Sequence, residues 1–254
     1  MDRLREIQDQ EPSPAGRSAL TDILENRIIA GKQHLPMCQD TGMILVFADV
    51  GQEIHFLGGG LSEAIVEGVR QGSKEGFLRN SIVSEPLFAR RNSGDNTPPV
   101  IHYDLIPGDQ LKLIVAAKGF GAENMSRLMM LTPAQGIDEV KRQVVQCVVD
   151  AGPNACPPVV VGVGIGGTME KATLLAKKAL MREMGQHHPD ARYAAFEEEL
   201  LRLVNATGIG PQGWGGKNTA LDVRVEYSPT HIAGLPLAIN LDCHLNRHIT
   251  IVMD

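Results

Sequence analysis

The chain has 254 residues and a formal net charge of −6, with 43% hydrophobic and 21% charged residues. This composition indicates a globular protein that buries a substantial core. Because no run of Lys and Arg stands out, we expect neither nucleic acid nor a membrane surface as a partner, whereas a small acidic substrate remains possible. No apolar stretch approaches the roughly 20 residues of a membrane span, and no hydrophobic signal core opens the sequence, so we expect a cytoplasmic protein.

The first half of the sequence predicts alternating helices and strands. In chain order we expect a helix over 17–31, a strand over 43–50, a helix over 61–77, a loop over 84–99, and strands over 100–106 and 111–119. The last two segments alternate in hydrophobicity around Pro107, Gly108 and Asp109, which are turn-forming residues. This pattern predicts that the two strands pair with each other as a β-hairpin.

The second half predicts a helix, a buried strand, two further helices and a strand-rich end. The respective ranges are 136–152, 157–168, 169–185, 193–208 and 219–254. We find no internal repeat and no clear linker, so residues 1–254 are expected to form a single domain. The expected fold class is mixed α/β (α+β), with sheets of mixed strands flanked by several helices.

Four cysteines stand far apart, at Cys38, Cys147, Cys156 and Cys243. They lack the dense spacing of a disulfide-rich scaffold, so in a reducing compartment they are thiols or metal ligands. Cys147 repeats with apolar residues on one face of the predicted helix 136–152, and we interpret it as a core residue.

The other three cysteines lie in segments rich in turn formers, PMCQDTG, NACPPVV and LDCHLNRH. A cubane cluster takes thiolates from several directions, and these can come from distant loops. Three ligands on four irons leave one iron open, and an open iron is a Lewis acid. The spacing alone does not establish a cluster, because isolated cysteines without a CxxC pair are weakly diagnostic.

The stretches PMCQDTG, AKGFGAENMS, CPPVVVGVGIGGTMEKA, GIGPQGWGGKNTALDV and HIAGLPLAINLDCHLNRH occur in this order. From about Ser18 to its end, the chain resembles the class I, iron-sulfur fumarate hydratase and L-tartrate dehydratase family. The resemblance implies the fold of the N-terminal domain of class I fumarases. It also implies a 4Fe-4S cluster held by Cys38, Cys156 and Cys243, with one iron left to bind substrate.

The same resemblance implies roles for five further residues. Asp40 and His231 match catalytic positions, whereas Gln39, Arg79 and Gly121 match substrate-binding positions. An arginine fork suits a substrate carboxylate, and a histidine donates or shuttles a proton near neutral pH. Without the family context, the QDTG stretch would be read as an Asx turn or helix cap, and Arg79 as a solvated side chain.

Three other motifs have competing interpretations. GVGIGG at 162–167 fits a dinucleotide fingerprint, but a second helix follows the first, so we expect no βαβ unit. We interpret the glycines as residues that pack a helix N-terminus close to the cluster, where its partial positive charge favours anions. His244 and His248 would suggest zinc only on a helix, and their surroundings look strand-like. The glycine loop that ends at Lys217 is similar to the loop around Gly121, and we interpret it as a second loop whose backbone amides contact the substrate.

Single-chain members of the family continue past the third cysteine into a second domain, whereas this sequence stops at ITIVMD. We therefore expect either that a separate β subunit supplies the missing half, in an α2β2 heterotetramer, or that the sequence is a piece of a longer chain. On either account we expect no activity from this chain alone. The expected reaction is the reversible hydration of fumarate to (S)-malate. L-tartrate and mesaconate remain alternative small dicarboxylate substrates, and a non-catalytic iron-sulfur sensor is the alternative of a different class.

Overall fold

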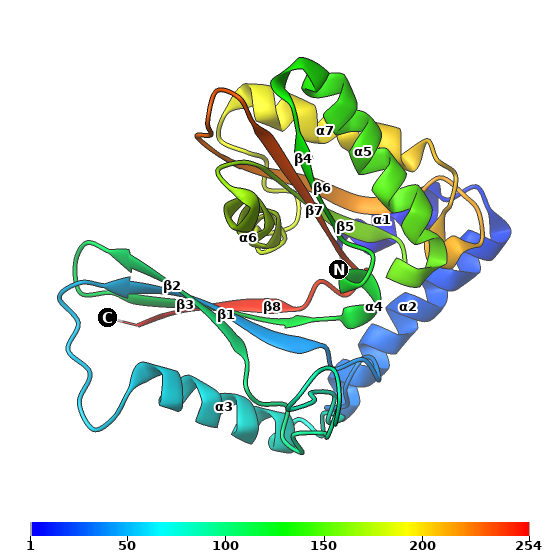
Figure 1. Ribbon diagram of the computed structural model, residues 1–254. Coiled ribbons are helices and arrows are strands. Elements are labelled where there is room, and N and C mark those ends of the chain that lie inside the picture. The colour runs from blue at the N-terminus through cyan, green and yellow to red at the C-terminus, as the bar shows by residue number, and fades with distance from the viewer. Residues whose placement is uncertain (1, 254) are drawn as a thin grey trace. The chain divides into compact units, whose positions relative to one another are not determined.

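The computed structural model describes residues 2–253, which divide into two compact units (Figure 1). The first unit combines the segment up to Glu25 with Gly121–Asn246, and the second combines Asn26–Phe120 with the segment from Arg247 onward. Each unit contains one four-stranded sheet of mixed direction. The predicted mixed α/β fold class is therefore confirmed.

The first unit contains most of the helices. Its elements are α1 (Asp2–Gln10), the start of α2 (Pro14–Gln33), most of α4 (Phe120–Glu123), β4 (Arg127–Leu131), α5 (Gly136–Ala151), β5 (Val159–Gly166), α6 (Met169–Ala179), α7 (Ala191–Asn205), β6 (Ala220–Ser228) and β7 (Leu235–Asp242). The sequence patterns predicted neither α1 nor β4. Among the described residues, no helix has the length and apolarity required to cross a membrane.

The sheet of the first unit has the strand order β4-β7-β5-β6. Helices α5 and α7 cover one face and α6 covers the other (Figure 1). Strand β5 pairs parallel with β6 although α6 and α7 both lie between them, so the expectation that no βαβ unit forms was wrong. The connection simply contains two helices instead of one.

Residues of β5 alternate between the two faces of this sheet. Val159, Val161 and Val163 enter the core beneath α5 and α7. On the other face, a Cβ added to Gly162 would lie 2.1 Å from the carbonyl oxygen of Ala176, and one on Gly164 would lie 2.0 Å from that of Ala172. The fingerprint glycines therefore allow α6 to pack closely on the sheet. The expectation that they bring the N-terminus of this helix close to the cysteines was wrong for Cys156, because α6 begins after Gly166, at the opposite end of β5.

The second unit is built on the sheet β2-β1-β3-β8. Its elements are the end of α2, β1 (Met43–Gly51), α3 (Leu61–Glu75), β2 (Val100–Ile106), β3 (Leu111–Lys118) and β8 (His248–Met253). Residues 84–99 contain no helix or extended strand, only an isolated bridge between Val83 and Asn92. The predicted loop is thus confirmed.

The predicted hairpin between residues 100–106 and 111–119 was wrong. Strand β1 lies between β2 and β3, pairing parallel with the first and antiparallel with the second. The connecting turn crosses the end of β1, where the Gly51 N–H donates to the carbonyl oxygen of Gln110 at 2.9 Å. A turn signal is local, so it cannot reveal that a strand from elsewhere in the sequence separates the two flanking segments.

Candidate functional site

The Cys38 loop lies in the second unit, between α2 and β1. The Asn26 side chain fixes it from α2 by donating to the carbonyl oxygen of Met37 at 2.8 Å. The backbone N–H of Asp40 donates to the Cys38 Sγ at 3.4 Å. The Cys38 sulfur also lies 3.5 Å from the Gln39 Oε1, so the cysteine and its two neighbours form one hydrogen-bonded loop.

Asp40 organises this loop with both carboxylate oxygens. Its Oδ1 accepts the Gly42 N–H at 2.9 Å, which forms the Asx turn, and its Oδ2 accepts the Phe120 N–H at 2.8 Å. Arg247 donates to the Asp40 carbonyl oxygen at 2.9 Å. The QDTG stretch and the AKGFG stretch are therefore joined through one side chain.

Arg79 is exposed and belongs to the same unit. Its carbonyl oxygen accepts a hydrogen bond of 2.8 Å from the hydroxyl of buried Thr41. The second unit thus brings four sequence-predicted site residues, Cys38, Gln39, Asp40 and Arg79, into adjoining loops.

Cys156 and Cys243 meet at one end of the sheet in the first unit. Val160, at the start of β5, pairs with Asp242, at the end of β7, so the loops that precede and follow these strands are neighbours. The His244 N–H lies 3.4 Å from the carbonyl oxygen of Cys156. Residues 87 positions apart in the sequence therefore share one edge of the fold.

Gly121 lies beside the Cys156 loop. A Cβ added there would lie 3.2 Å from the carbonyl oxygen of Asn154. Gly121 therefore lies against the turn that delivers Cys156.

His231 is placed at the opposite end of β7. It lies in the exposed turn between β6 and β7, whereas Cys243 follows the last residue of β7. The eight residues of β7 span roughly 25 Å at the rise of an extended strand. The Nδ1 of His231 accepts the Ala233 N–H at 3.2 Å, so in the neutral ring the proton lies on Nε2. Within this chain, His231 and the two cysteines of the first unit are not brought together.

Cys147 is excluded from the site by its surroundings. It is fully buried in the core with α5, α7 and the sheet. Burial raises the pKa of its thiol to about 12. Its prediction as a core residue is confirmed.

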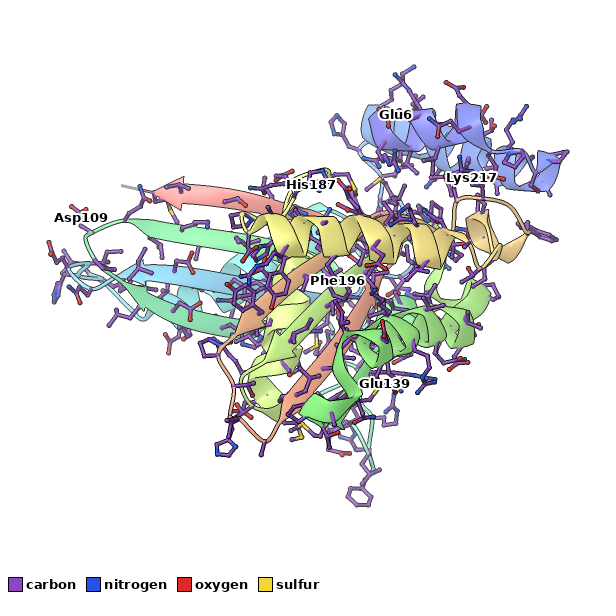
Figure 2. All side chains as sticks on the ribbon, turned by 90° about the horizontal axis from the view of Figure 1, so that it is seen from above. Glu6, Asp109, Glu139, His187, Phe196 and Lys217 are labelled. Carbon is purple, nitrogen blue, oxygen red and sulfur yellow. The ribbon has the colours of Figure 1, made fainter. Side chains whose placement is uncertain are left out.

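Sequence reasoning missed Glu11, which organises the glycine loop before Lys217. The buried carboxylate accepts the backbone N–H groups of Lys217 at 3.0 Å and of Asn218 at 3.0 Å, and the Ser13 N–H at 3.0 Å. A Cβ on Gly216 would lie 2.3 Å from the Glu11 Oε1. In Figure 2 this loop, labelled at Lys217, lies against the N-terminal helices. No local sequence signal links residues 206 positions apart.

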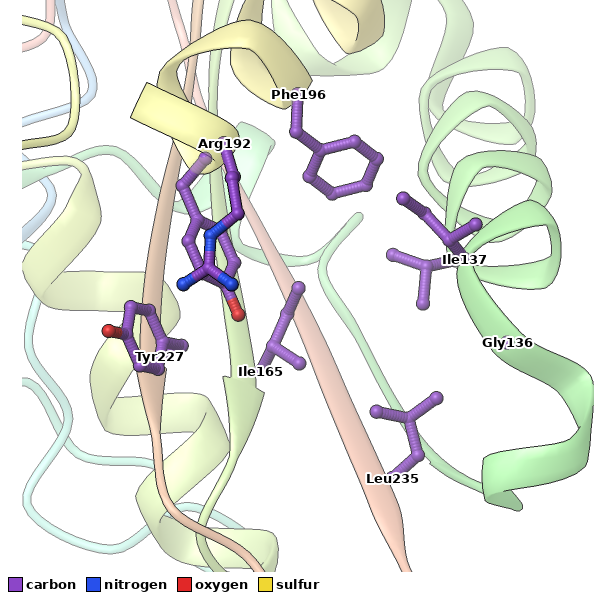
Figure 3. A pocket seen from close by; sticks show the side chains of 9 residues that line it. Gly136, Ile137, Ile165, Arg192, Phe196, Tyr227 and Leu235 are labelled. Atoms are coloured by element: carbon purple, nitrogen blue, oxygen red, sulfur yellow. The ribbon is translucent and has the colours of Figure 1, made fainter. Parts of the chain in front are cut away.

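The first unit also contains an apolar cavity of about 470 Å³. Figure 3 shows Ile137, Phe196, Ile165 and Leu235 around it, with Arg192 and Tyr227 at its side. The rings of Tyr193 and Tyr227 stack there at 4.4 Å. No sequence-predicted site residue lines this cavity, so it is not a part of the candidate site.

Three thiols with the chemistry of cluster ligands lie in loops. Cys156 is exposed, Cys38 and Cys243 are partly exposed, and Cys147 is buried. Within the described residues of 2–253, no group of three or more His, Cys, Asp or Glu side chains is gathered at metal-binding distances. The donor set of Cys38, Cys156 and Cys243 fits an iron-sulfur group by its chemistry. Cys38 belongs to the second unit, and Cys156 and Cys243 belong to the first.

Comparisons with known proteins identify relatives over nearly the whole chain. The family model described as fumarate hydratase (Fumerase) matches residues 1–252. A putative L(+)-tartrate dehydratase subunit alpha of Methanocaldococcus jannaschii is 41% identical over 249 residues, covering 96% of this chain and 87% of the relative. The L(+)-tartrate dehydratase subunit alpha of Escherichia coli O157:H7 is 32% identical over 257 residues, covering 100% of this chain and 84% of the relative.

Proposed function

This chain belongs to the fumarate hydratase (Fumerase) family, a family of hydro-lyases, and we propose that it is the α subunit of an iron-sulfur hydro-lyase for a small C4 dicarboxylate. The observation that supports this most is the convergence of the Cys156 and Cys243 loops at one edge of the first unit. The pairing of Cys38 with Asp40 in a single turn is the second support.

Cys38, Cys156 and Cys243 would hold a 4Fe-4S cluster. When bound, such a cluster with one iron free of protein ligands supplies a Lewis acid for the substrate hydroxyl and carboxylate. Cys147 contributes nothing to it, because its thiol is buried and its raised pKa disfavours the thiolate.

The neighbouring side chains of the second unit would bind and orient the substrate. Arg79 is exposed beside the Cys38 loop, where its planar fork can hold a carboxylate through two parallel hydrogen bonds. Gln39 adds an amide next to the thiolate. Asp40 assists proton transfer at the leaving oxygen, and its two backbone hydrogen bonds keep its carboxylate in one orientation.

His231 would act on the site of a second α subunit. The length of β7 separates it from Cys156 and Cys243 of its own chain, yet its turn is exposed and its Nε2 is directed away from the Ala233 N–H. An α2β2 heterotetramer supplies the second copy and satisfies both facts. The names of the relatives, which are alpha subunits, support a β subunit as the other partner.

The names of the relatives favour L(+)-tartrate as the substrate, whereas from the sequence we expected fumarate. Both molecules carry two carboxylates, and Arg79 can hold one of them in either molecule. L(+)-tartrate is therefore the first substrate to test, with fumarate and mesaconate as alternatives.

The test is turnover by the anaerobically assembled complex of this chain with the β subunit. Comparing kcat/KM for L(+)-tartrate, fumarate and mesaconate decides the substrate. A complex with full iron content that turns over none of the three would refute the hydro-lyase and favour the iron-sulfur sensor.

A further inference from the structure

Two residues with no assigned role, Gln212 and His244, lie against the peptide that follows Cys156. The Gln212 backbone N–H and its Nε2 both donate to the carbonyl oxygen of Pro157, at 2.8 Å and 2.6 Å. The His244 backbone N–H and its Nδ1 both lie within reach of the carbonyl oxygen of Cys156, at 3.4 Å and 3.1 Å. Two consecutive carbonyl groups are thus each held by two donors of a single residue.

The contacts of His244 are compatible with two tautomers. Its Nδ1 lies 3.3 Å from the Gln212 Nε2 and 3.1 Å from the Cys156 oxygen, and it cannot accept from the first while donating to the second. The Gln212 amide has two hydrogens, so it can donate to Pro157 with one and still face Nδ1 with the other. We adopt the tautomer with the proton on Nδ1, because the contact with the Cys156 oxygen is the shorter of the two; in this tautomer His244 donates to Cys156.

The backbone of Cys156 needs such support. It adopts φ 54° and ψ 62°, a left-handed conformation that non-glycine residues rarely take, and a proline follows it, which disfavours a helical conformation further. Strained backbone of this kind persists only where the surrounding structure over-determines it. Gln212 itself has φ 53°, so this contact joins two segments that each contain a non-glycine residue with left-handed backbone.

We propose that Gln212 and His244 are positioning residues that hold the Cys156 thiol, and through the adjacent Cys243 the second thiol, in their ligand arrangement before any cluster is bound. Only the statement that this arrangement serves a cluster rests on the proposed function. The clamp, meaning the hydrogen bonds from Gln212 and His244 to these two carbonyl oxygens, consists of contacts within the protein chain. Because His244 follows Cys243 directly, one side chain couples the two cysteine loops.

The test compares His244→Asn with His244→Gln in the full chain. The Asn amide N–H falls near the position of Nδ1, whereas the Gln amide falls near that of Nε2, so only the first variant retains the donor to Cys156. Gln212→Gly is the companion variant, since glycine accepts the positive φ and keeps the backbone donor but lacks Nε2. His187→Gln and Gln186→Gly, at exposed positions of the same unit, are matched controls.

The first readout is backbone hydrogen exchange of the cluster-free chain in segments 153–160, 210–216 and 241–247. His244→Gln and Gln212→Gly are expected to exchange about three to ten times faster there than the controls, with His244→Asn close to the unmodified chain. Segment 36–42, in the other unit, is expected to remain unchanged. Equal exchange in His244→Asn and His244→Gln would overturn the assignment of the Nδ1 donor. Unchanged exchange in every variant would overturn the clamp.

The second readout is the rate at which a chelator removes iron from the loaded complex. His244→Gln is expected to lose iron about three to ten times faster than His244→Asn. Equal rates in a complex that does bind iron would overturn the link to the cluster. If the unmodified chain binds no iron at all, the proposed function fails, while the exchange experiment still decides whether the clamp exists.

Discussion

Asp40 and Phe120 are joined by a hydrogen bond of 2.8 Å from the Phe120 N–H to the Asp40 Oδ2. Because Oδ1 simultaneously accepts the Gly42 N–H, both carboxylate oxygens face donors. An Asn at this position would present an N–H to one of those donors, so it is not a neutral replacement. Asp40 therefore combines a structural role with its proposed role in proton transfer.

Asp40→Asn is expected to lower kcat of the assembled complex by about 100-fold or more, because the proton-transfer group is removed. It is also expected to destabilise the chain by about 1–3 kcal/mol, because one backbone donor is left without an acceptor. Urea denaturation and steady-state kinetics measure the two effects separately. Asp109→Asn, in the exposed turn between β2 and β3, is the control and should change neither. Full activity in Asp40→Asn would remove Asp40 from the proposed mechanism.

Glu11 is expected to contribute a pH-dependent part of the stability. Burial by itself would raise the pKa of Glu11, but hydrogen bonds from Ser13, Asn218 and Lys217 outweigh it and lower that pKa below 4.5. Since the folded pKa is depressed, this stabilisation is present above about pH 4.5 and is lost as the pH falls through the folded pKa.

Glu11→Gln should therefore destabilise the chain by about 2–3 kcal/mol at pH 7, and by progressively less as the pH falls below 4.5. Thermal or urea unfolding at several pH values measures the difference. Glu6→Gln on α1, an exposed carboxylate paired with Arg3, is the matched control and should cost almost nothing. A loss that does not vary with pH would contradict the role assigned to the carboxylate.

Gly164→Ala tests the packing of α6 on β5. The added methyl would lie 2.0 Å from the carbonyl oxygen of Ala172, which is helix backbone and cannot move aside without shifting α6. We expect a loss of about 1–3 kcal/mol of unfolding free energy. Gly68→Ala on α3, where nothing lies within 4 Å, should be neutral or slightly stabilising. Equal stability of the two variants would contradict the packing interpretation.

The placement of His231 predicts complementation between two inactive α subunits. Mixed complexes of His231→Ala chains and Asp40→Asn chains contain one site with both residues intact if His231 acts in the second subunit. Random assembly should then recover about a quarter of the unmodified activity. If His231 acts within its own chain, mixing recovers nothing, and this result would contradict the proposed arrangement.

Elements with a strong local period could be predicted from the sequence. The helix expected at 136–152 is α5 (Gly136–Ala151), and the buried face that it predicted does contain Cys147. The strand at 157–168 and the loop at 84–99 were recognised for the same reason, since apolar runs and turn residues act over short distances. Strand order depends on distant pairings, so the insertion of β1 between β2 and β3 left no local signal.

The same distinction between local and distant signals applies to the candidate site. The cysteine loops were identified from their own residues and their family resemblance, and the Asx turn at Asp40 was among the readings of QDTG. The buried Glu11 and the clamp by Gln212 and His244 join segments far apart in the sequence, so only the fold reveals them. The separation of His231 from Cys243 likewise follows from β7 being one continuous strand.

The most direct test of the central proposal is the iron content of the four single cysteine variants after anaerobic reconstitution. Cys38→Ser, Cys156→Ser and Cys243→Ser should each lose most of the about four irons per chain expected for a cubane cluster, whereas Cys147→Ala should retain them. Iron quantification with electron paramagnetic resonance of the reduced protein provides the measurement. Full iron content in any of the three serine variants, or loss only in Cys147→Ala, would contradict the proposed ligand set.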